Sequence, residues 1–280
     1  MASLLPNTYK IMQNAPIFGT GVSSFKDFQN LAHACDAAIS HGIRAFDTAP
    51  SYKTEEILCA ALHDIMKKRN IRRDGIYIQT KIDPIQMYNG NVETYLYHKL
   101  KAMQLDYVDA LLIHWPVFEY LSRTWKELET IKKHGMARRI GICNLRIEHM
   151  KNLYGRGFHP DIIQIERHPL NTFEDERLFC IDNGIVLQDY SPLCKMHPLL
   201  RENPILHVLA EKYKTSIGLL ILRWHLDTGA VPIFTSKNVD RISEYAGVQA
   251  FCISLEDCNK ISSLNINHKL YLESLVCPGF

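Results

Sequence analysis

The sequence predicts an α/β fold, and within that class a single (β/α)8 TIM barrel. Short apolar runs that suit buried strands alternate with longer segments in which apolar residues recur at helical spacing. Such alternation is typical of parallel β-α-β units, which build both doubly wound sheets and barrels. About eight strand–helix pairs in a chain of 280 residues favour the barrel.

The predicted elements follow in order along the chain. The first strand lies within residues 16–21, and the others span 43–46, 76–80, 108–113, 137–142, 162–166, 185–188 and 230–234. The helices span 28–41, 54–68, 92–103, 122–134, 146–153, 173–183 and 216–227, with a short helix from 239 and an inserted helix around 205–214. Gly42 and Gly135 stand where helices commonly end. Residues 264–280 show no clear periodicity, so we expect a loop or tail with aromatic ends there.

The glycine pattern and the linker composition argue against a different domain organisation. No Gly-x-Gly-x-x-Gly follows the first predicted strand, so a doubly wound dinucleotide-binding sheet lacks its fingerprint, and Gly19-Thr20-Gly21 is too short to supply it. No Pro-, Ser- or Gly-rich linker divides the chain. We therefore expect residues 1–280 to form one domain.

The bulk composition excludes several classes of partner and site. A formal net charge of +2 gives no reason to expect nucleic acid or an anionic membrane surface. No apolar segment reaches the ~18 residues of a membrane helix, and the start of the chain lacks the features of a signal peptide. Eight cysteines without a Cys-x-x-Cys pair or a Cys/His cluster predict reduced thiols in a cytoplasmic protein with no metal site. We further expect a monomer.

Three predicted strands deliver chemically useful side chains at their C-terminal ends. These side chains are Asp47, Lys81 and His114, and Tyr52 lies in the loop that follows the first of the three strands. Catalytic groups of a (β/α)8 barrel lie at this end of the strands. A lone strand-end Asp is more often structural, but the set together suits protonation of an oxygen on which negative charge develops.

The expected roles follow from acid–base chemistry. A phenol has a pKa of about 10 and is a weak proton donor unless a neighbouring cation lowers that value. We expect Lys81 to supply the cation for Tyr52, and Asp47 to hold Lys81 in place and charged. His114 can hydrogen-bond a carbonyl oxygen and orient it. Hydride transfer to a carbonyl group is a reaction that needs such a set.

The phrases that carry these residues resemble a known family. FDTAPSY, the TK of IYIQTK, and LDYVDALLIHWP match, in this order and spacing, the aldo-keto reductases, and the resemblance runs from about Pro16 to Glu244. The chain is most similar to the shorter, microbial members. The resemblance implies a (β/α)8 barrel that reduces an aldehyde or ketone with NADPH, with Tyr52 as general acid. It also implies a substrate pocket bordered by Trp115, Tyr52 and His114.

The same resemblance implies residues that hold the cofactor. Asn144 and Gln164 match the pair that binds the nicotinamide amide, and Tyr190 matches the tyrosine that stacks on the ring. Cys143 stands where the family has serine. Residues matched to the pyrophosphate-side loop and the adenosine-phosphate segment are Ser191, Leu193, Thr235, Ser236, Arg241 and Glu244.

A phosphate-binding arginine predicts NADPH rather than NADH. Thr235 replaces the usual lysine and Tyr245 the usual asparagine, but the guanidinium of Arg241 can bind a 2′-phosphate with two hydrogen bonds. Tyr88 and Phe118 are further candidates for the pocket wall, together with the tail near Phe280.

Two other functions compete with this one. The chain could be a cofactor-binding regulatory subunit with weak or vestigial activity, although such a subunit has no need of all four polar residues. It could also be an unrelated barrel isomerase or lyase, which would not bind NADPH.

Overall fold

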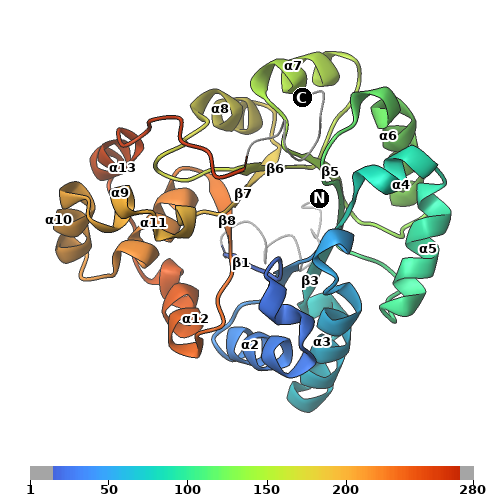
Figure 1. Ribbon diagram of the computed structural model, residues 1–280, viewed down its shortest axis with the longest axis horizontal. Coiled ribbons are helices and arrows are strands. Elements are labelled where there is room, and N and C mark those ends of the chain that lie inside the picture. Colours follow the sequence, from blue (N-terminus) through green and yellow to red (C-terminus); the bar gives the residue numbers. More distant parts are fainter. Residues whose placement is uncertain (1–14, 272–280) are drawn as a thin grey trace, which may run out of the picture.

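The computed structural model describes residues 15–271 and contains a closed barrel of eight parallel strands. Each strand pairs with the next one in the chain, and β8 pairs with β1 through Ile17 and Ile233 to close the barrel. The helices surround the strands (Figure 1). The strands are β1 Ile17–Gly19, β2 Ala45–Asp47, β3 Tyr77–Ile82, β4 Ala110–Ile113, β5 Ile140–Cys143, β6 Ile162–Glu166, β7 Val186–Tyr190 and β8 Ala230–Phe234. The predicted fold class is confirmed.

Helices connect the strands on the outside of the barrel. The α-helices are α2 Phe28–Ser40, α3 Glu55–Arg69, α4 Pro84–Asn89, α5 Val92–Ala102, α6 Phe118–Lys133, α7 Ile147–Gly155, α8 Glu174–Asp182, α9 Pro198–Arg201, α10 Pro204–Lys212, α11 Ile217–Asp227, α12 Val239–Ala246 and α13 Leu255–Ser262. Short 3-10 turns are η1 Ser23–Lys26, η2 Pro50–Tyr52, η3 Arg73–Gly75, η4 Cys194–Met196 and η5 Gly247–Ala250. Among the described residues, no helix is both long and apolar enough to cross a membrane.

Several elements differ from the sequence-based expectation. Helices α4 and α13 were not predicted, because each is too short to show a helical period, and helix α6 begins at Phe118 rather than at residue 122. Pro84 stands at the first position of α4, where the missing N–H costs nothing. The Ser254 side chain caps α13 by accepting from the backbone N–H of Asp257. Strand β3 also extends to Ile82, so Lys81 lies inside it.

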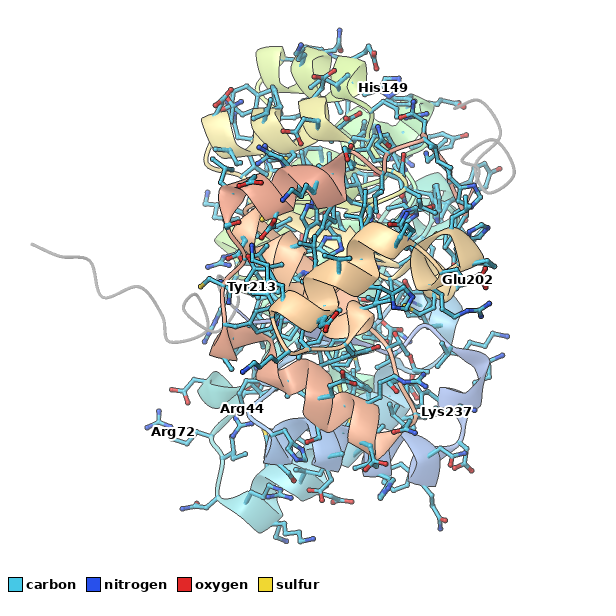
Figure 2. The ribbon with its side chains drawn as sticks, turned by 90° about the vertical axis from the view of Figure 1, so that its left-hand side faces the viewer. Arg44, Arg72, His149, Glu202, Tyr213 and Lys237 are labelled. Atoms are coloured by element: carbon cyan, nitrogen blue, oxygen red, sulfur yellow. The ribbon has the colours of Figure 1, made fainter. Side chains whose placement is uncertain are left out.

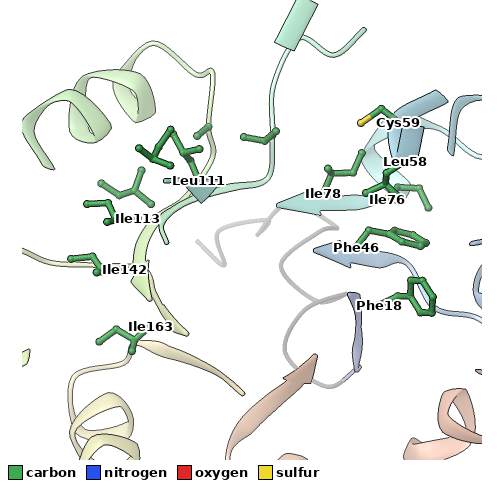
Figure 3. Close-up of a cluster of buried hydrophobic side chains, with 14 of the residues drawn as sticks. Phe18, Phe46, Leu58, Cys59, Ile76, Ile78, Leu111, Ile113, Ile142 and Ile163 are labelled. Carbon is green, nitrogen blue, oxygen red and sulfur yellow. The ribbon is translucent and has the colours of Figure 1, made fainter. Parts of the chain in front are cut away.

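The pleat of the strands divides their side chains between two environments. Phe18, Phe46 and Ile78 point outward into the main hydrophobic core between strands and helices (Figure 3). Their neighbours Ala45 and Tyr77 point into the barrel, where they belong to a smaller interior cluster. Because successive residues of a strand face opposite sides, Asp47 and Lys81 must also point into the barrel.

The two ends of the barrel carry different parts of the chain. Lys237 follows β8 and lies at one end, whereas Arg44 and Arg72 precede strands and lie at the other (Figure 2). Side chains that follow parallel strands therefore gather on one face. In (β/α)8 enzymes this is the face that carries the active site.

Strand β5 approaches its neighbours too closely for any side chain at Gly141. A Cβ there would lie 2.3 Å from the carbonyl oxygen of Ile162 and 2.7 Å from the Leu112 side chain. Gly141→Ala should therefore lower the free energy of unfolding by about 1–3 kcal/mol or more, as overpacking does. The matched control is Gly155→Ala, where nothing lies within 4 Å. Equal thermal melting of the two variants would contradict this packing constraint.

Candidate active site

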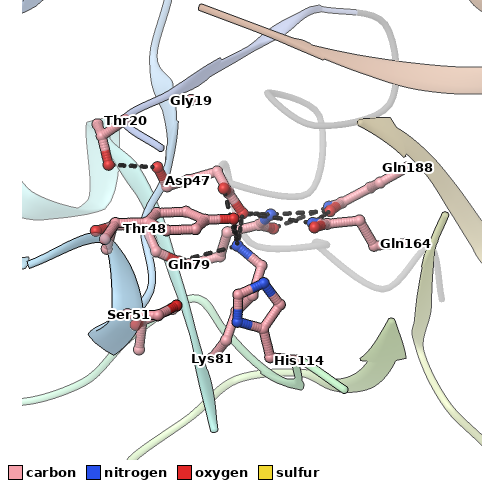
Figure 4. Close-up of polar contacts among 12 residues, drawn as sticks. Gly19, Thr20, Asp47, Thr48, Ser51, Gln79, Lys81, His114, Gln164 and Gln188 are labelled. Atoms are coloured by element: carbon pink, nitrogen blue, oxygen red, sulfur yellow. Dashed lines mark hydrogen bonds and ion pairs between the residues drawn. The ribbon is translucent and has the colours of Figure 1, made fainter. Parts of the chain in front are cut away.

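A buried ion pair between β2 and β3 forms the floor of the site. Asp47 aligns with Gln79 in the strand register, so Lys81 projects two residues further along the same inner face. Its ammonium lies 2.9 and 2.7 Å from the two Asp47 oxygens, and both side chains are buried (Figure 4). Burial acts to lower the pKa of Lys81, but the Asp47 carboxylate outweighs it and raises that pKa above its usual value. The ammonium therefore stays charged.

The same ammonium reaches Tyr52 in turn η2. Besides Asp47, Lys81 Nζ donates to the Thr48 carbonyl at 3.0 Å and to the Tyr52 hydroxyl oxygen at 3.4 Å. These three directions use the three protons of the ammonium group. Because the Tyr52 oxygen accepts from Lys81, its own O–H proton remains available for a molecule bound beside it.

The electrostatics of Tyr52 correct one expectation. Burial raises the pKa of Tyr52 to about 12, and the Lys81 ammonium lowers it only in part. The expected net lowering is therefore wrong, because the ring is removed from water as well as placed near a cation. The phenol keeps its proton throughout the neutral range. The Lys81 ammonium lies close enough to the hydroxyl to stabilise a phenolate if one forms.

Three threonine hydroxyls fix the turn that carries Tyr52. Thr54 contacts the hydroxyls of Thr20 at 2.8 Å and Thr48 at 2.9 Å, and Thr20 donates to the backbone carbonyl of Asp47 at 3.0 Å. All three threonines are fully buried. Since each hydroxyl is paired, the network ties the end of β2 to the start of α3 and leaves the turn between them little freedom.

His114 follows β4 and lies beside Tyr52. The two rings meet edge to face with centroids 5.6 Å apart, and the Trp115 ring lies 6.3 Å from His114. Asp83, directly after β3, holds the other side of the imidazole through a 2.5 Å contact between its Oδ1 and His114 Nδ1. Burial is the main effect that keeps the pKa of His114 below its usual value, and the nearby Lys81 ammonium acts in the same direction.

A layer of glutamine amides supports the ion pair from within the barrel. Gln79 donates to Asp47 at 2.6 Å, and Gln79 and Gln188 exchange two hydrogen bonds of 2.9 Å. Gln164 adds donations to Gln188 at 2.9 Å and to Asp47 at 3.4 Å. The layer surrounds the Asp47 carboxylate with donors, so its negative charge is compensated on several sides.

Asp47, Tyr52, His114 and Gln164 border a cavity of about 280 Å³ at the C-terminal ends of the strands. Glu166 shapes one wall, because its carboxylate accepts from the backbone N–H groups of Leu270 and Tyr271 at 2.6 and 2.9 Å. Tyr271 thereby stands against Tyr190, with ring centroids 5.8 Å apart. The cavity is lined by Gly19, Gly21, Asp47, Tyr52, His114, Trp115, Asn144, Gln164, Tyr190, Ser191, Ile233, Thr235 and Tyr271.

Comparison with known proteins places this geometry in a family. The family model for the aldo/keto reductase family matches residues 17–266. The chain belongs to the aldo/keto reductase family. It is therefore an oxidoreductase, and the resemblance identified from the sequence is confirmed.

Individual members of the family resemble the chain over most of its length. A glyoxal reductase of Bacillus subtilis is 34% identical over 274 residues, which cover 96% of this chain and 97% of that protein. A methylglyoxal reductase of Escherichia coli O157:H7 is 32% identical over 91% of both chains. A Bombyx mori aldo-keto reductase solved in complex with NADP superposes with a TM-score of 0.84 at 28% identity, covering 93% of this chain and 92% of that one.

In this aldo/keto reductase the residues predicted to hold a nicotinamide lie together. Asn144 and Gln164 border the cavity with Tyr190, whose hydroxyl donates to Asn144 Oδ1 at 2.8 Å. Asn144 Nδ2 donates in turn to the His114 carbonyl at 2.9 Å. Cys143 is fully buried among apolar interior residues, and burial raises the pKa of its thiol. The thiol therefore stays neutral.

The other predicted cofactor residues of the reductase are divided between cavity and periphery. Ser191 and Thr235 line the cavity, whereas Leu193 packs against the hydrophobic core. The Ser236 hydroxyl donates to the backbone carbonyl of Asn238 and accepts from its backbone N–H. Arg241 and Glu244 lie exposed on α12, outside the cavity.

Sequence reasoning placed two pocket residues wrongly and missed others. Tyr88 packs against Tyr120, and Phe118 lies 4.6 Å from His149, so neither borders the cavity, while Phe280 lies outside the described residues. The missed residues are Asp83, Gln79, Gln188 and Tyr271. For Gln79 and Asp83 a signal existed, because both lie two residues from Lys81 and so share its side of an extended strand.

Within residues 15–271 no group of three or more His, Cys, Asp or Glu side chains is arranged to hold a metal ion.

Removing the Lys81 ammonium tests the contribution of the buried ion pair to stability. Lys81→Met should lower the free energy of unfolding by about 3 kcal/mol or more, because it leaves the Asp47 carboxylate buried and without its cation. The double variant Lys81→Met/Asp47→Asn is the matched control, and it should recover most of that loss. Chemical denaturation measures both. A single variant as stable as the parent would show that Asp47 does not depend on Lys81.

Proposed function

We propose that this enzyme reduces a small aldehyde or ketone to an alcohol, with NADPH as the hydride donor and Tyr52 as the general acid. The observation that carries the proposal is the chain of contacts from Asp47 through Lys81 to the Tyr52 hydroxyl, at the wall of a cavity. Such a chain places a proton donor where an alkoxide would develop, with a fixed cation behind it.

The proton-transfer step follows from the arrangement of these three side chains. Tyr52 holds its proton in the resting state, since its pKa is raised to about 12. An alkoxide formed beside it is a stronger base than a phenolate and takes the proton. The Lys81 ammonium then stabilises the phenolate, and Asp47 keeps that ammonium in place at 2.7 Å.

The side chains around Tyr190 suit a nicotinamide amide. Its aromatic ring offers a flat surface for stacking, and the amides of Asn144 and Gln164 border the same cavity. Gln164 Nε2 is already bonded to Gln188 and Asp47, so its carbonyl oxygen is the atom that would accept from the amide N–H. NADPH, when bound there, supplies the hydride.

Two features support NADPH as the cofactor. Arg241 projects from the first turns of α12, where its guanidinium would meet a 2′-phosphate together with the positive end of the helix. The Bombyx mori relative was solved with NADP, the oxidised form of that cofactor.

Two features support a small substrate. The cavity of about 280 Å³ is slightly smaller than the range of ~300–1,000 Å³ for ligand sites. The similar Bacillus subtilis and Escherichia coli proteins are named for glyoxal and methylglyoxal.

Tyr52→Phe tests the acid directly. The variant keeps the ring and its packing but loses the proton, so kcat for any accepted aldehyde should fall by at least ~100-fold. NADPH affinity and thermal melting should remain near those of the parent. Reduction at near the parental rate would show that the proton comes from another group. A parent protein that binds NADPH and reduces none of a panel of aldehydes and ketones would instead favour a regulatory subunit.

Arg241→Ala tests the cofactor preference. Loss of a charge-assisted phosphate contact of ~1.5–3 kcal/mol should raise the Kd for NADPH roughly tenfold to hundredfold and leave that for NADH nearly unchanged. Arg72→Ala, at the opposite end of the barrel, is the control for removing a surface arginine. Equal weakening of both cofactors would remove the case for a 2′-phosphate site at α12.

A further inference from the structure

Residues 264–271 form a strap, called the terminal strap below, that lies along the segment after β6. It begins just beyond α13 and contains no helix or strand of its own. The backbone N–H groups of Ile266 and His268 both donate to the Leu170 carbonyl, at 3.2 and 2.9 Å. The strap is therefore tied to the residues that follow the C-terminal end of β6.

Glu166, the last residue of β6, holds the end of the terminal strap that reaches the cavity. One carboxylate oxygen accepts from the backbone N–H of Leu270 at 2.6 Å, and the other accepts from that of Tyr271 at 2.9 Å. Burial acts to raise the pKa of Glu166, but hydrogen bonds from His168 and from the two backbone N–H groups outweigh it and hold the pKa below its usual value. The buried carboxylate is therefore ionised at neutral pH and offers only acceptors.

Tyr271 is the residue of the terminal strap that borders the cavity. Its ring meets that of Tyr190 with centroids 5.8 Å apart and planes inclined by 68°, and the Lys195 ammonium lies 5.0 Å from its centroid. Tyr271 does not fill the cavity, because about 280 Å³ stay open beside it, Asn144 and Tyr190. The ring of Tyr271 is therefore a wall of the part of the cavity that suits a nicotinamide.

We propose that Glu166 is a positioning residue for cofactor binding, and that it acts by holding Tyr271 beside Tyr190 to complete the surface on which a nicotinamide binds. This inference rests on the proposed function. It adds a residue that contacts neither the cofactor nor the reacting atoms. A wall that is already in place loses little conformational entropy when a ligand binds. Glu166 therefore lowers the Kd for NADPH and slows its release, and it has no part in proton transfer.

An amide at position 166 cannot hold the terminal strap in the same way. Glutamine has one acceptor oxygen and one NH2 group, so in Glu166→Gln one of the two backbone N–H groups meets a donor. An unmade hydrogen bond at a buried site is costly. The end of the strap should therefore detach from β6, while the bonds to the Leu170 carbonyl remain.

Hydrogen exchange of the protein without cofactor tests the anchor. In Glu166→Gln the amides of Leu270 and Tyr271 should exchange at least tenfold faster than in the parent. Those of Ile266 and His268, which bond to a backbone carbonyl, should change by less than threefold. Unchanged exchange of both Leu270 and Tyr271 would overturn the anchoring role.

Binding of NADPH tests the consequence. The Kd from fluorescence titration should rise tenfold or more in Glu166→Gln, mostly through faster dissociation in stopped-flow displacement. A single turnover of an accepted aldehyde at saturating NADPH should stay within threefold of the parental rate. The control is Glu174→Gln, which removes an exposed carboxylate paired with Arg177 and should leave the Kd unchanged.

The outcomes separate this inference from the proposed function. A parent that binds NADPH and reduces aldehydes, with an unchanged or lower Kd in Glu166→Gln, would overturn the inference alone. A slower single turnover with an unchanged Kd would also overturn it, because Glu166 would then act on the chemical step. A parent that does not bind NADPH would overturn both.

Tyr271→Ala keeps the inference testable if Glu166→Gln folds poorly. This variant removes the ring but keeps the backbone N–H that bonds to Glu166, and the Kd for NADPH should rise by a similar factor. Tyr271→Phe restores the ring and should recover most of that loss. Adding Glu166→Gln to Tyr271→Ala should raise the Kd by less than a further threefold, because both changes act through one ring. Parental affinity in Tyr271→Ala, or losses that multiply in the double variant, would show that Glu166 does not act through Tyr271.

Discussion

The buried ion pair between Asp47 and Lys81 constrains the whole active end of the barrel. Both charges are removed from water, which is tolerable only because they meet at 2.7 Å and because further donors surround the carboxylate. Three glutamine side chains, at positions 79, 164 and 188, supply those donors or orient them.

The strand pleat transmits this constraint to the rest of the site. In β3, the side chains of Tyr77, Gln79 and Lys81 face the barrel interior, whereas those of Ile78 and Thr80 face the helices. A shift of the register by one residue would exchange the two sets and bury an ammonium among apolar helices. The dense outer core fixes the register, and the register fixes the position of the ammonium relative to Tyr52.

Around this fixed charge, Tyr52, which we propose as the proton donor, and His114 are held by separate sets of contacts. Tyr52 lies on a turn that is held by hydrogen bonds among buried threonine hydroxyls. His114 contacts the carboxylate of Asp83 at the end of the neighbouring strand. Asp83 thus links the end of β3 to the end of β4 through its contact with the imidazole. The wall opposite is completed by Tyr271, which Glu166 anchors from β6 through two backbone N–H groups. Strands therefore carry the buried ion pair, and the segments that directly follow strands carry Tyr52 and His114.

The sequence alone determined the barrel, the approximate strand positions and the quartet of Asp47, Tyr52, Lys81 and His114, because local periodicity and short motifs record which residues follow each strand. It also indicated Asn144, Gln164 and Tyr190 through family resemblance. Only the tertiary structure revealed the glutamine layer, the grip of Asp83 on His114 and the place of Tyr271, since these contacts join residues up to 109 positions apart. The same holds for the raised pKa of Tyr52. Nearby charges can be inferred from motifs, but burial depends on how all eight strands pack together.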